Sequence, residues 1–239
     1  MTCGNGNFPP ISVFLQHMLN AHSFYLILAY IASAFTIIPF IIALLHRNYL
    51  SKEFKILWLL VTCSLLTEIT SSILVFIFKT SNVQLFNCYI IIETIIISLF
   101  YVSIIENKLW RILFSVFCAS FSIYSSVQLI TSSIKTLDYV FLTVESLMVI
   151  LFSIVAFHNI LKFSKYNSLL SAPIFWINSA FLLFFSGNLF LHLFSQYLQE
   201  FAQKAFYELW GFHSLFNIIF YSLISIAFWK TKTSQISNS

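Results

Sequence analysis

The chain is dominated by apolar stretches that are long enough to cross a lipid bilayer. A hydrocarbon core of about 30 Å requires roughly 20 apolar residues in a helix that rises about 1.5 Å per residue. The stretches that meet this length are 23–46, 54–78, 83–105, 110–131, 138–162, 171–198 and 206–229. Because a helix satisfies its own backbone hydrogen bonds in lipid, the sequence predicts an all-α polytopic membrane protein, a seven-transmembrane-helix bundle.

The composition leaves little material for a separate soluble domain. Only 8% of the 239 residues are charged and 59% are hydrophobic, against about 25% charged residues in an ordinary soluble domain. We expect an extracytoplasmic N-terminal segment at 1–22, the membrane domain at 23–229 and a cytoplasmic polar tail at 230–239. The first 22 residues contain no Lys or Arg, and a signal peptide would have a basic region there, so we expect the amino terminus to be retained.

Lysine and arginine are unevenly divided between the two sets of connections. One set, with the carboxyl terminus, holds nine of the 12: Arg47, Lys52, Lys55, Lys108, Arg111, Lys162, Lys165, Lys230 and Lys232. The other set holds Lys79, Lys135 and Lys204. Cytoplasmic loops carry the excess of basic residues, so the predicted orientation is N-out/C-in. No basic run is interleaved with exposed aromatic residues, so the expected partner is the lipid bilayer and not a nucleic acid.

Three glutamates, Glu68, Glu93 and Glu145, lie inside apolar stretches. A charged side chain at the bilayer centre costs about 3 kcal/mol on insertion scales, so such residues usually face the bundle interior and mark functional sites. A carboxylate in this environment must be protonated or paired. The glutamates are therefore the strongest candidates for a functional site.

The sixth and seventh stretches add polar side chains at comparable depth. Residues four apart share one face of a helix, as Asn188 and His192 do, and His213 and Asn217. If these faces converge with the glutamates, the bundle contains a polar pocket that opens to the outer side and binds a cation, an amine or a proton. The candidate ligand-binding residues are Glu68, Glu93, Glu145, Asn188, His192, His213 and Asn217.

Two further helix faces are predicted to point inward. One carries Ser64, Glu68, Ser71 and Ser72, and the other carries Tyr89, Glu93 and Tyr101. The alternative for the uncharged members, and for the amides, is hydrogen bonding between helices, worth about 0.6 kcal/mol per bond in membranes. Asn178, nearer the cytoplasmic end, is expected to have only this structural role. Pro39, inside the first stretch, predicts a local kink.

Cofactor chemistry has weak support in the sequence. His192 and His213 with one glutamate would supply three zinc ligands, but no HExxH or HxxxH spacing places two ligands on one helix. A retinal Schiff base needs a lysine inside the last stretch, and none lies between Ala205 and Trp229. The four cysteines, Cys3, Cys63, Cys88 and Cys118, form no CxxC pair and are expected to act as small apolar side chains, with a Cys3–Cys88 disulfide left open. No cofactor and no catalytic residue is predicted.

The end of the chain carries a resemblance. The segment Glu208-Leu209-Trp210-Gly211-Phe212-His213-Ser214-Leu215-Phe216-Asn217-Ile218-Ile219, followed by Ala227-Phe228-Trp229-Lys230, is similar to uncharacterised seven-helix membrane proteins of Bacteroidota. The similarity covers mainly the last two spans. It implies a multi-pass protein of the bacterial inner membrane, linked to a signalling partner such as a sensor kinase.

Four functions fit these features. The favoured one is a receptor- or sensor-like integral membrane protein whose pocket informs a separate cytoplasmic or membrane partner. The alternatives are a proton or small-cation transporter, an intramembrane metal-dependent lipid hydrolase using a pair such as Glu68 and His213, and a structural membrane subunit. The transporter has no internal repeat to support it, and the hydrolase has no compact nucleophile or ligand motif, so an enzyme is the less favoured class.

Overall fold

The computed structural model describes residues 24–25, 27–131, 139–163 and 169–236, and within them every long element is an α-helix. Seven helices are long and apolar enough to cross a membrane, the first at Ile27–Leu45. The elements are α2 (Ile37–Leu45), η1 (Arg47–Tyr49), α3 (Lys52–Phe76), α4 (Val83–Ile104), α5 (Lys108–Thr131), α6 (Tyr139–Phe163), η2 (Leu169–Ser171), α7 (Pro173–Phe201) and α8 (Gln203–Ile236). The predicted multi-pass helical fold is confirmed.

The last helix differs from the prediction at its end. α8 continues beyond Trp229 to Ile236, so the segment predicted as a polar tail begins as a continuation of the last helix. Thr231 explains part of this continuation because it is 3% exposed and its hydroxyl donates to the Phe228 carbonyl at 2.7 Å. The predicted N-terminal segment, 1–22, lies outside the described residues, and Cys3 with it.

The first span is interrupted at Thr36, as the proline in it predicts. A proline has no N–H to donate four residues back, and the carbonyl left without this donor is that of Phe35. The chain makes a single turn there, with the Thr36 N–H donating to the Ser33 carbonyl at 3.2 Å, and α2 begins at Ile37. Pro39 thus falls in the first turn of α2, where a missing N–H is tolerated.

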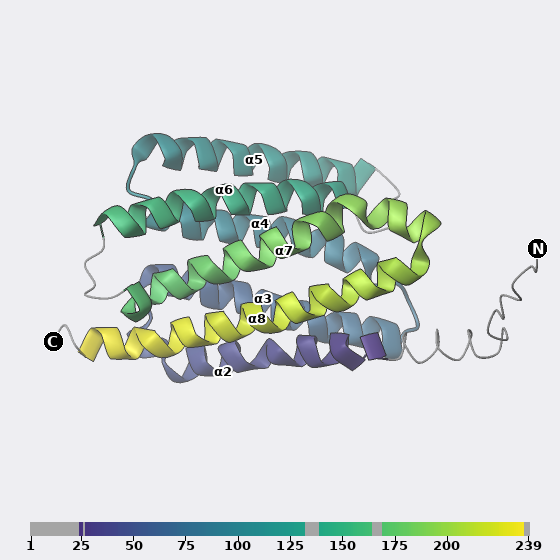
Figure 1. The fold of residues 1–239 in the computed structure, drawn as a ribbon, viewed down its shortest axis with the longest axis horizontal. Coiled ribbons are helices and arrows are strands. Elements are labelled where there is room, and N and C mark those ends of the chain that lie inside the picture. Colours follow the sequence, from purple (N-terminus) through teal and green to yellow (C-terminus); the bar gives the residue numbers. More distant parts are fainter. Residues whose placement is uncertain (1–23, 26, 132–138, 164–168, 237–239) are drawn as a thin grey trace, which may run out of the picture.

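Most of the helices form a closed ring. Contacts run from α2 to α3, α3 to α4, α4 to α6, α6 to α7, α7 to α8, and from α8 back to α2. α5 packs against α4 outside this ring and covers α6 along one side of the bundle (Figure 1). The Phe114 ring of α5 stacks on Phe152 of α6 at 3.9 Å between ring centroids, which attaches the outer helix to the core.

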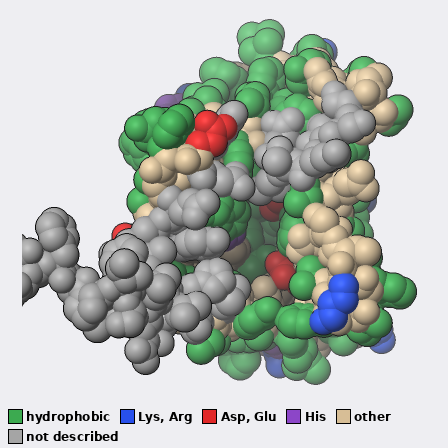
Figure 2. All heavy atoms as spheres, turned by 90° about the vertical axis from the view of Figure 1, so that its right-hand side faces the viewer, with side chains coloured by type: hydrophobic (Ala, Val, Ile, Leu, Met, Phe, Trp, Pro, Cys, Tyr) green, Lys and Arg blue, Asp and Glu red, His purple; other side chains and the backbone are tan. Residues whose placement is uncertain are grey.

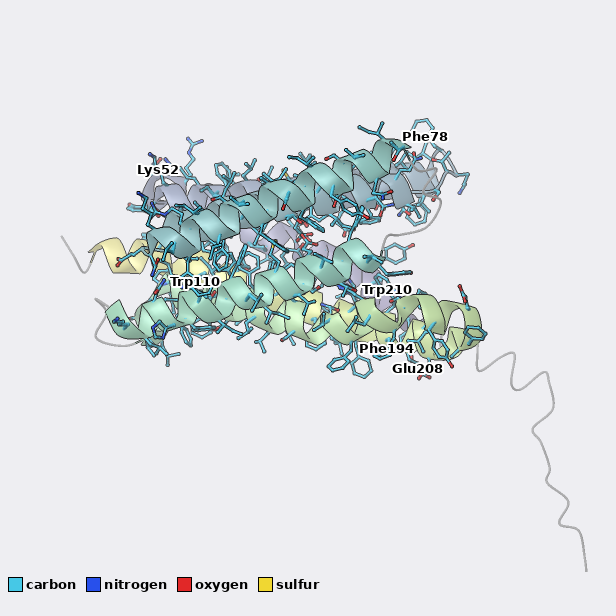
Figure 3. The ribbon with its side chains drawn as sticks, turned by 90° about the horizontal axis from the view of Figure 1, so that it is seen from above. Lys52, Phe78, Trp110, Phe194, Glu208 and Trp210 are labelled. Atoms are coloured by element: carbon cyan, nitrogen blue, oxygen red, sulfur yellow. The ribbon has the colours of Figure 1, made fainter. Side chains whose placement is uncertain are left out.

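The two ends of the bundle differ in charge and packing. Lys52 and Trp110 lie at one end, whereas Phe78, Glu208 and Trp210 lie toward the other (Figure 3). The end with Lys52 collects the described members of the larger basic set, because they stand at the starts of α3 and α5 and the ends of α6 and α8. We call it the basic end, and the opposite end, which holds the α7–α8 connection, the distal end.

The half of the bundle toward the basic end is a dense aromatic core. Phe100, Phe152, Phe181 and Phe228 are at most 1% exposed, and Tyr101 packs against Phe181 with ring centroids 5.7 Å apart. The Tyr101 hydroxyl donates to Oδ1 of Asn178 at 2.9 Å, and the Asn178 amide donates to the Ser153 carbonyl at 2.9 Å. Asn178 therefore has a structural role, as predicted. The aromatic core fills the interior of the bundle toward the basic end.

Candidate ligand-binding site

A cavity of about 380 Å³ occupies the other half of the ring. Its wall takes residues from the first span, α3, α4, α6, α7 and α8, and none of its described residues from α5. Figure 2 shows the distal end of the molecule, where the surface is hollowed at its centre and acidic side chains lie inside the hollow. The cavity thus opens at the end opposite the larger basic set.

All three glutamates of the apolar stretches line this cavity. Glu145 of α6 is only 1% exposed, and its Oε1 accepts a hydrogen bond from the Thr94 hydroxyl of α4 at 2.6 Å. Glu93, one residue before Thr94, interacts with the Tyr89 hydroxyl and is close enough to Glu145 for their charges to act on each other. Glu68 comes from α3 and interacts with the Ser33 hydroxyl of the first span. The three glutamates therefore converge on one cavity.

His213 is held between two asparagines. The Asn188 amide donates to the Phe184 carbonyl at 2.8 Å, which leaves Oδ1 of Asn188 to accept from Nδ1 of His213 at 3.0 Å. On the other side of the ring, the Asn217 amide lies 3.0 Å from Nε2 of His213 and donates to it. Since one ring nitrogen donates and the other accepts, the hydrogen bonds fit a neutral imidazole.

His192 is oriented by a serine of the neighbouring helix. The Ser146 hydroxyl donates to the Leu142 carbonyl at 2.7 Å, so its oxygen accepts from Nδ1 of His192 at 3.0 Å. His192 is 4% exposed and lines the cavity. With Nδ1 as the donor, the neutral form of this ring keeps Nε2 as an acceptor that faces the cavity wall.

Aromatic rings form much of the remaining wall. Phe184 and Trp210 flank His213, with ring centroids 5.8 and 4.8 Å from the imidazole. Tyr221 closes the inner side and its hydroxyl lies 2.6 Å from the Ser64 hydroxyl, joining α8 to α3. The further aromatic residues of the wall are Tyr25, Phe86, Tyr89, Phe185 and Phe220. Among the described residues that line the cavity there is no lysine or arginine.

Glycines allow two aromatic rings to approach the helices around the cavity. A Cβ on Gly187 of α7 would lie within 2.7 Å of the Phe216 ring of α8. A Cβ on Gly211 of α8 would lie 2.6 Å from the ring of Tyr25, which lines the cavity. Real Cβ atoms do not approach so closely, so both contacts require glycine.

Most of the predicted candidates meet in this cavity. Glu68, Glu93, Glu145, His192, His213 and Asn217 line it, whereas Asn188 is fully buried behind His213 and orients that ring. Ligand binding by these residues stays a prediction. The sequence reading missed Trp210, although it shares a helix face with His213 three residues on, and it missed Thr94 and Ser146, whose partners lie on other helices.

The two inward-facing stripes are confirmed in part. Tyr101 points inward, as predicted, and is fully buried. It does not line the cavity, because eight residues beyond Glu93 it lies about 12 Å farther along the helix axis and is turned by about 80°. Ser64 and Glu68 line the cavity, but Ser72 is exposed and donates to the Glu68 carbonyl at 2.9 Å. Ser71 is buried away from it and accepts from the Asn82 amide at 2.6 Å. Helical spacing alone therefore predicts more residues at the cavity than the structure places there.

The donor geometry does not favour zinc at the histidines. Both nitrogens of His213 are already hydrogen-bonded to asparagines. Within the described residues, no group of three His, Cys, Asp or Glu side chains is placed to hold a metal ion. A zinc ion at His213 would have to displace the Asn217 amide.

Comparison with protein-family models, with curated proteins and with solved structures gave no significant match. The function of this chain therefore has to be inferred from the chemistry of the cavity.

Proposed function

We propose that this chain is a receptor- or sensor-like integral membrane protein that binds a small ligand in the cavity and signals through a separate partner. The observation that carries the proposal is the composition of the cavity wall, which takes side chains from α3, α4, α6, α7 and α8 and from the part of the first span that precedes α2. A ligand held by side chains from so many helices has different contacts in each arrangement of those helices. Such differential contacts are what a ligand needs in order to shift a conformational equilibrium.

A continuous series of packed rings offers a route from the cavity to the basic end. Phe220 in the cavity wall packs on Phe181 at 5.5 Å between centroids, and Phe181 packs on Tyr101 at 5.7 Å. The series continues from Tyr101 through Phe152 and Phe114 to Trp110, with centroid distances of 5.4, 3.9 and 5.5 Å. Coupling along this series is what the test below measures.

The orientation belongs to the same proposal. The excess of lysine and arginine at the basic end supports a cytoplasmic position for that end by the positive-inside rule, and the cavity then opens outward. The resemblance of the last spans to Bacteroidota proteins supports a bacterial inner membrane and a sensor kinase as the kind of partner. The described connections at the basic end, such as that between α4 and α5, are short, which supports signalling through a separate partner.

Photo-crosslinking from the basic end tests the proposal. A photoreactive amino acid replaces Glu106, which is exposed in the α4–α5 connection, in the cells that produce the protein. We expect it to capture one signalling protein, and we expect the yield to change by about twofold or more when Glu93→Gln alters the cavity. The same probe at the exposed Lys79, at the distal end, is the control and should not capture that protein. A crosslink yield that is the same with and without Glu93→Gln would contradict the receptor proposal.

A proton or small-cation transporter is the second candidate, because three carboxylates line a cavity inside the membrane-spanning helices and carboxylates serve as relays in transporters. Reconstituted vesicles containing a pH-sensitive dye separate the two. Proton or cation flux that disappears with Glu93→Gln would favour transport, whereas the receptor proposal predicts binding without flux.

A further inference from the structure

The cavity combines negative charge with an aromatic wall. Glu68, Glu93 and Glu145 all face it, and its described lining contains no lysine or arginine. His213 does not neutralise this charge, because its hydrogen bonds fit a neutral ring that donates to Asn188 and accepts from Asn217. The described lining therefore sets no lysine or arginine charge opposite the three carboxylates.

Glu145 is the most enclosed of the three carboxylates in the cavity wall. It is 1% exposed, and the Thr94 hydroxyl is the only donor found for it within the described residues. A carboxylate has two oxygens and about four acceptor positions. One so enclosed is stable only with a proton or beside a positive charge. Glu93 adds a second carboxylate next to it.

The wall decides which kind of cation fits. A metal ion such as Ca²⁺ takes six to eight oxygen ligands in a tight shell, and much of this wall is aromatic instead, with Phe184, Trp210 and Tyr221 among the rings. Aromatic faces attract organic ammonium groups through cation–π contacts. A volume of about 380 Å³ also lies in the range of small-molecule sites, about 300–1,000 Å³.

We propose that the ligand is a small organic amine or quaternary ammonium compound, with its positive charge beside Glu93 and Glu145 and its apolar body against the aromatic wall. The inference rests on the proposed ligand-binding function and names the chemical class of the ligand. An ammonium group reaches this site either on a soluble amine or on the head group of a membrane lipid, and the chemistry of recognition is the same for both.

Calorimetric titration of the protein in phosphatidylglycerol nanodiscs tests the charge requirement. The probes are 2-phenylethylammonium, the neutral 2-phenylethanol and the anionic 3-phenylpropionate, which share a phenyl ring and differ in charge. We expect the ammonium probe to bind about tenfold or more tightly than the alcohol, which corresponds to about 1.4 kcal/mol, and the anion to bind least. Equal binding of the alcohol, stronger binding of the anion, or no binding of any probe would overturn the inference.

Matched variants locate the charge. Glu93→Gln and Glu145→Gln keep the shape of the side chain and should each weaken the ammonium probe by about tenfold. Glu200→Gln removes an exposed carboxylate of α7 that does not line the cavity and should change the affinity by less than about twofold. An equal loss of affinity in Glu200→Gln would show that surface charge causes the effect, and it would overturn the placement of the ammonium group beside Glu93 and Glu145. Thermal unfolding of each variant confirms that it is folded.

A second set of nanodiscs distinguishes the two sources of the ammonium group. Phosphatidylethanolamine that competes with the ammonium probe would assign the site to a lipid head group, and absence of competition would assign it to a soluble amine. The receptor proposal is tested separately by the Glu106 crosslink. A crosslink yield that responds to Glu93→Gln while the charge series fails would leave the receptor standing and remove only the ammonium assignment.

Discussion

Replacing Gly187 with alanine is expected to strain the contact between α7 and α8 beside the cavity. The added Cβ would meet three atoms of the Phe216 ring, the farthest of them at 2.7 Å. Gly187 also adjoins Asn188, whose side chain positions His213 across the same helix pair. The substitution therefore tests both packing and the geometry of the site.

Two opposing effects set the magnitude. Alanine is better than glycine in a helix by about 1 kcal/mol, whereas overpacking a tight contact costs about 1–3 kcal/mol. The ring must move or the helices must separate, so we expect a net loss of about 1 kcal/mol in the free energy of unfolding. The measurement is unfolding of the purified protein in detergent, followed by tryptophan fluorescence.

A double-mutant cycle with Phe216→Leu separates these effects. Leucine removes the ring that the new methyl group would meet, so Gly187→Ala should become neutral or stabilising by up to about 1 kcal/mol in that background. The sign of the effect is thus expected to change between the two backgrounds. The same stabilisation by Gly187→Ala with and without the ring would refute the packing argument.

Three further predictions concern orientation and hydrogen bonding. A cysteine in place of the exposed Lys79 should react with a membrane-impermeant maleimide in intact cells. A cysteine in place of the exposed Arg47 should react only after the cells are permeabilised. The reverse pattern would overturn the N-out/C-in orientation. Tyr101→Phe removes two hydrogen bonds in the aromatic core and should cost about 1 kcal/mol of unfolding free energy, measured in detergent, while leaving the affinity of the ammonium probe unchanged within about twofold. Thr94→Val removes the hydroxyl that donates to Glu145 and should lower the unfolding free energy by about 1 kcal/mol, whereas Thr94→Ser should retain it.

The candidate site was predictable in its residue types and only partly in its geometry. A carboxylate inside an apolar helix has to face the protein interior, so Glu68, Glu93 and Glu145 stood out without a structure. The faces of the last two spans added His192 and His213 by helical spacing alone. The same spacing did not tell that Tyr101 lies away from the cavity. Rotation and distance accumulate along a helix, so a residue eight positions after Glu93 no longer lines the same site.

Helix number and length followed from the sequence, because spanning a membrane is a local property of about 20 consecutive residues. The order of the helices around the ring did not, since an apolar helix face suits lipid as well as another helix and carries little information on which helices meet. The tertiary structure placed α6 against α4 and left α5 outside. This arrangement brings Glu145 to Thr94 and Glu93, and with it the carboxylates and the aromatic wall form one cavity.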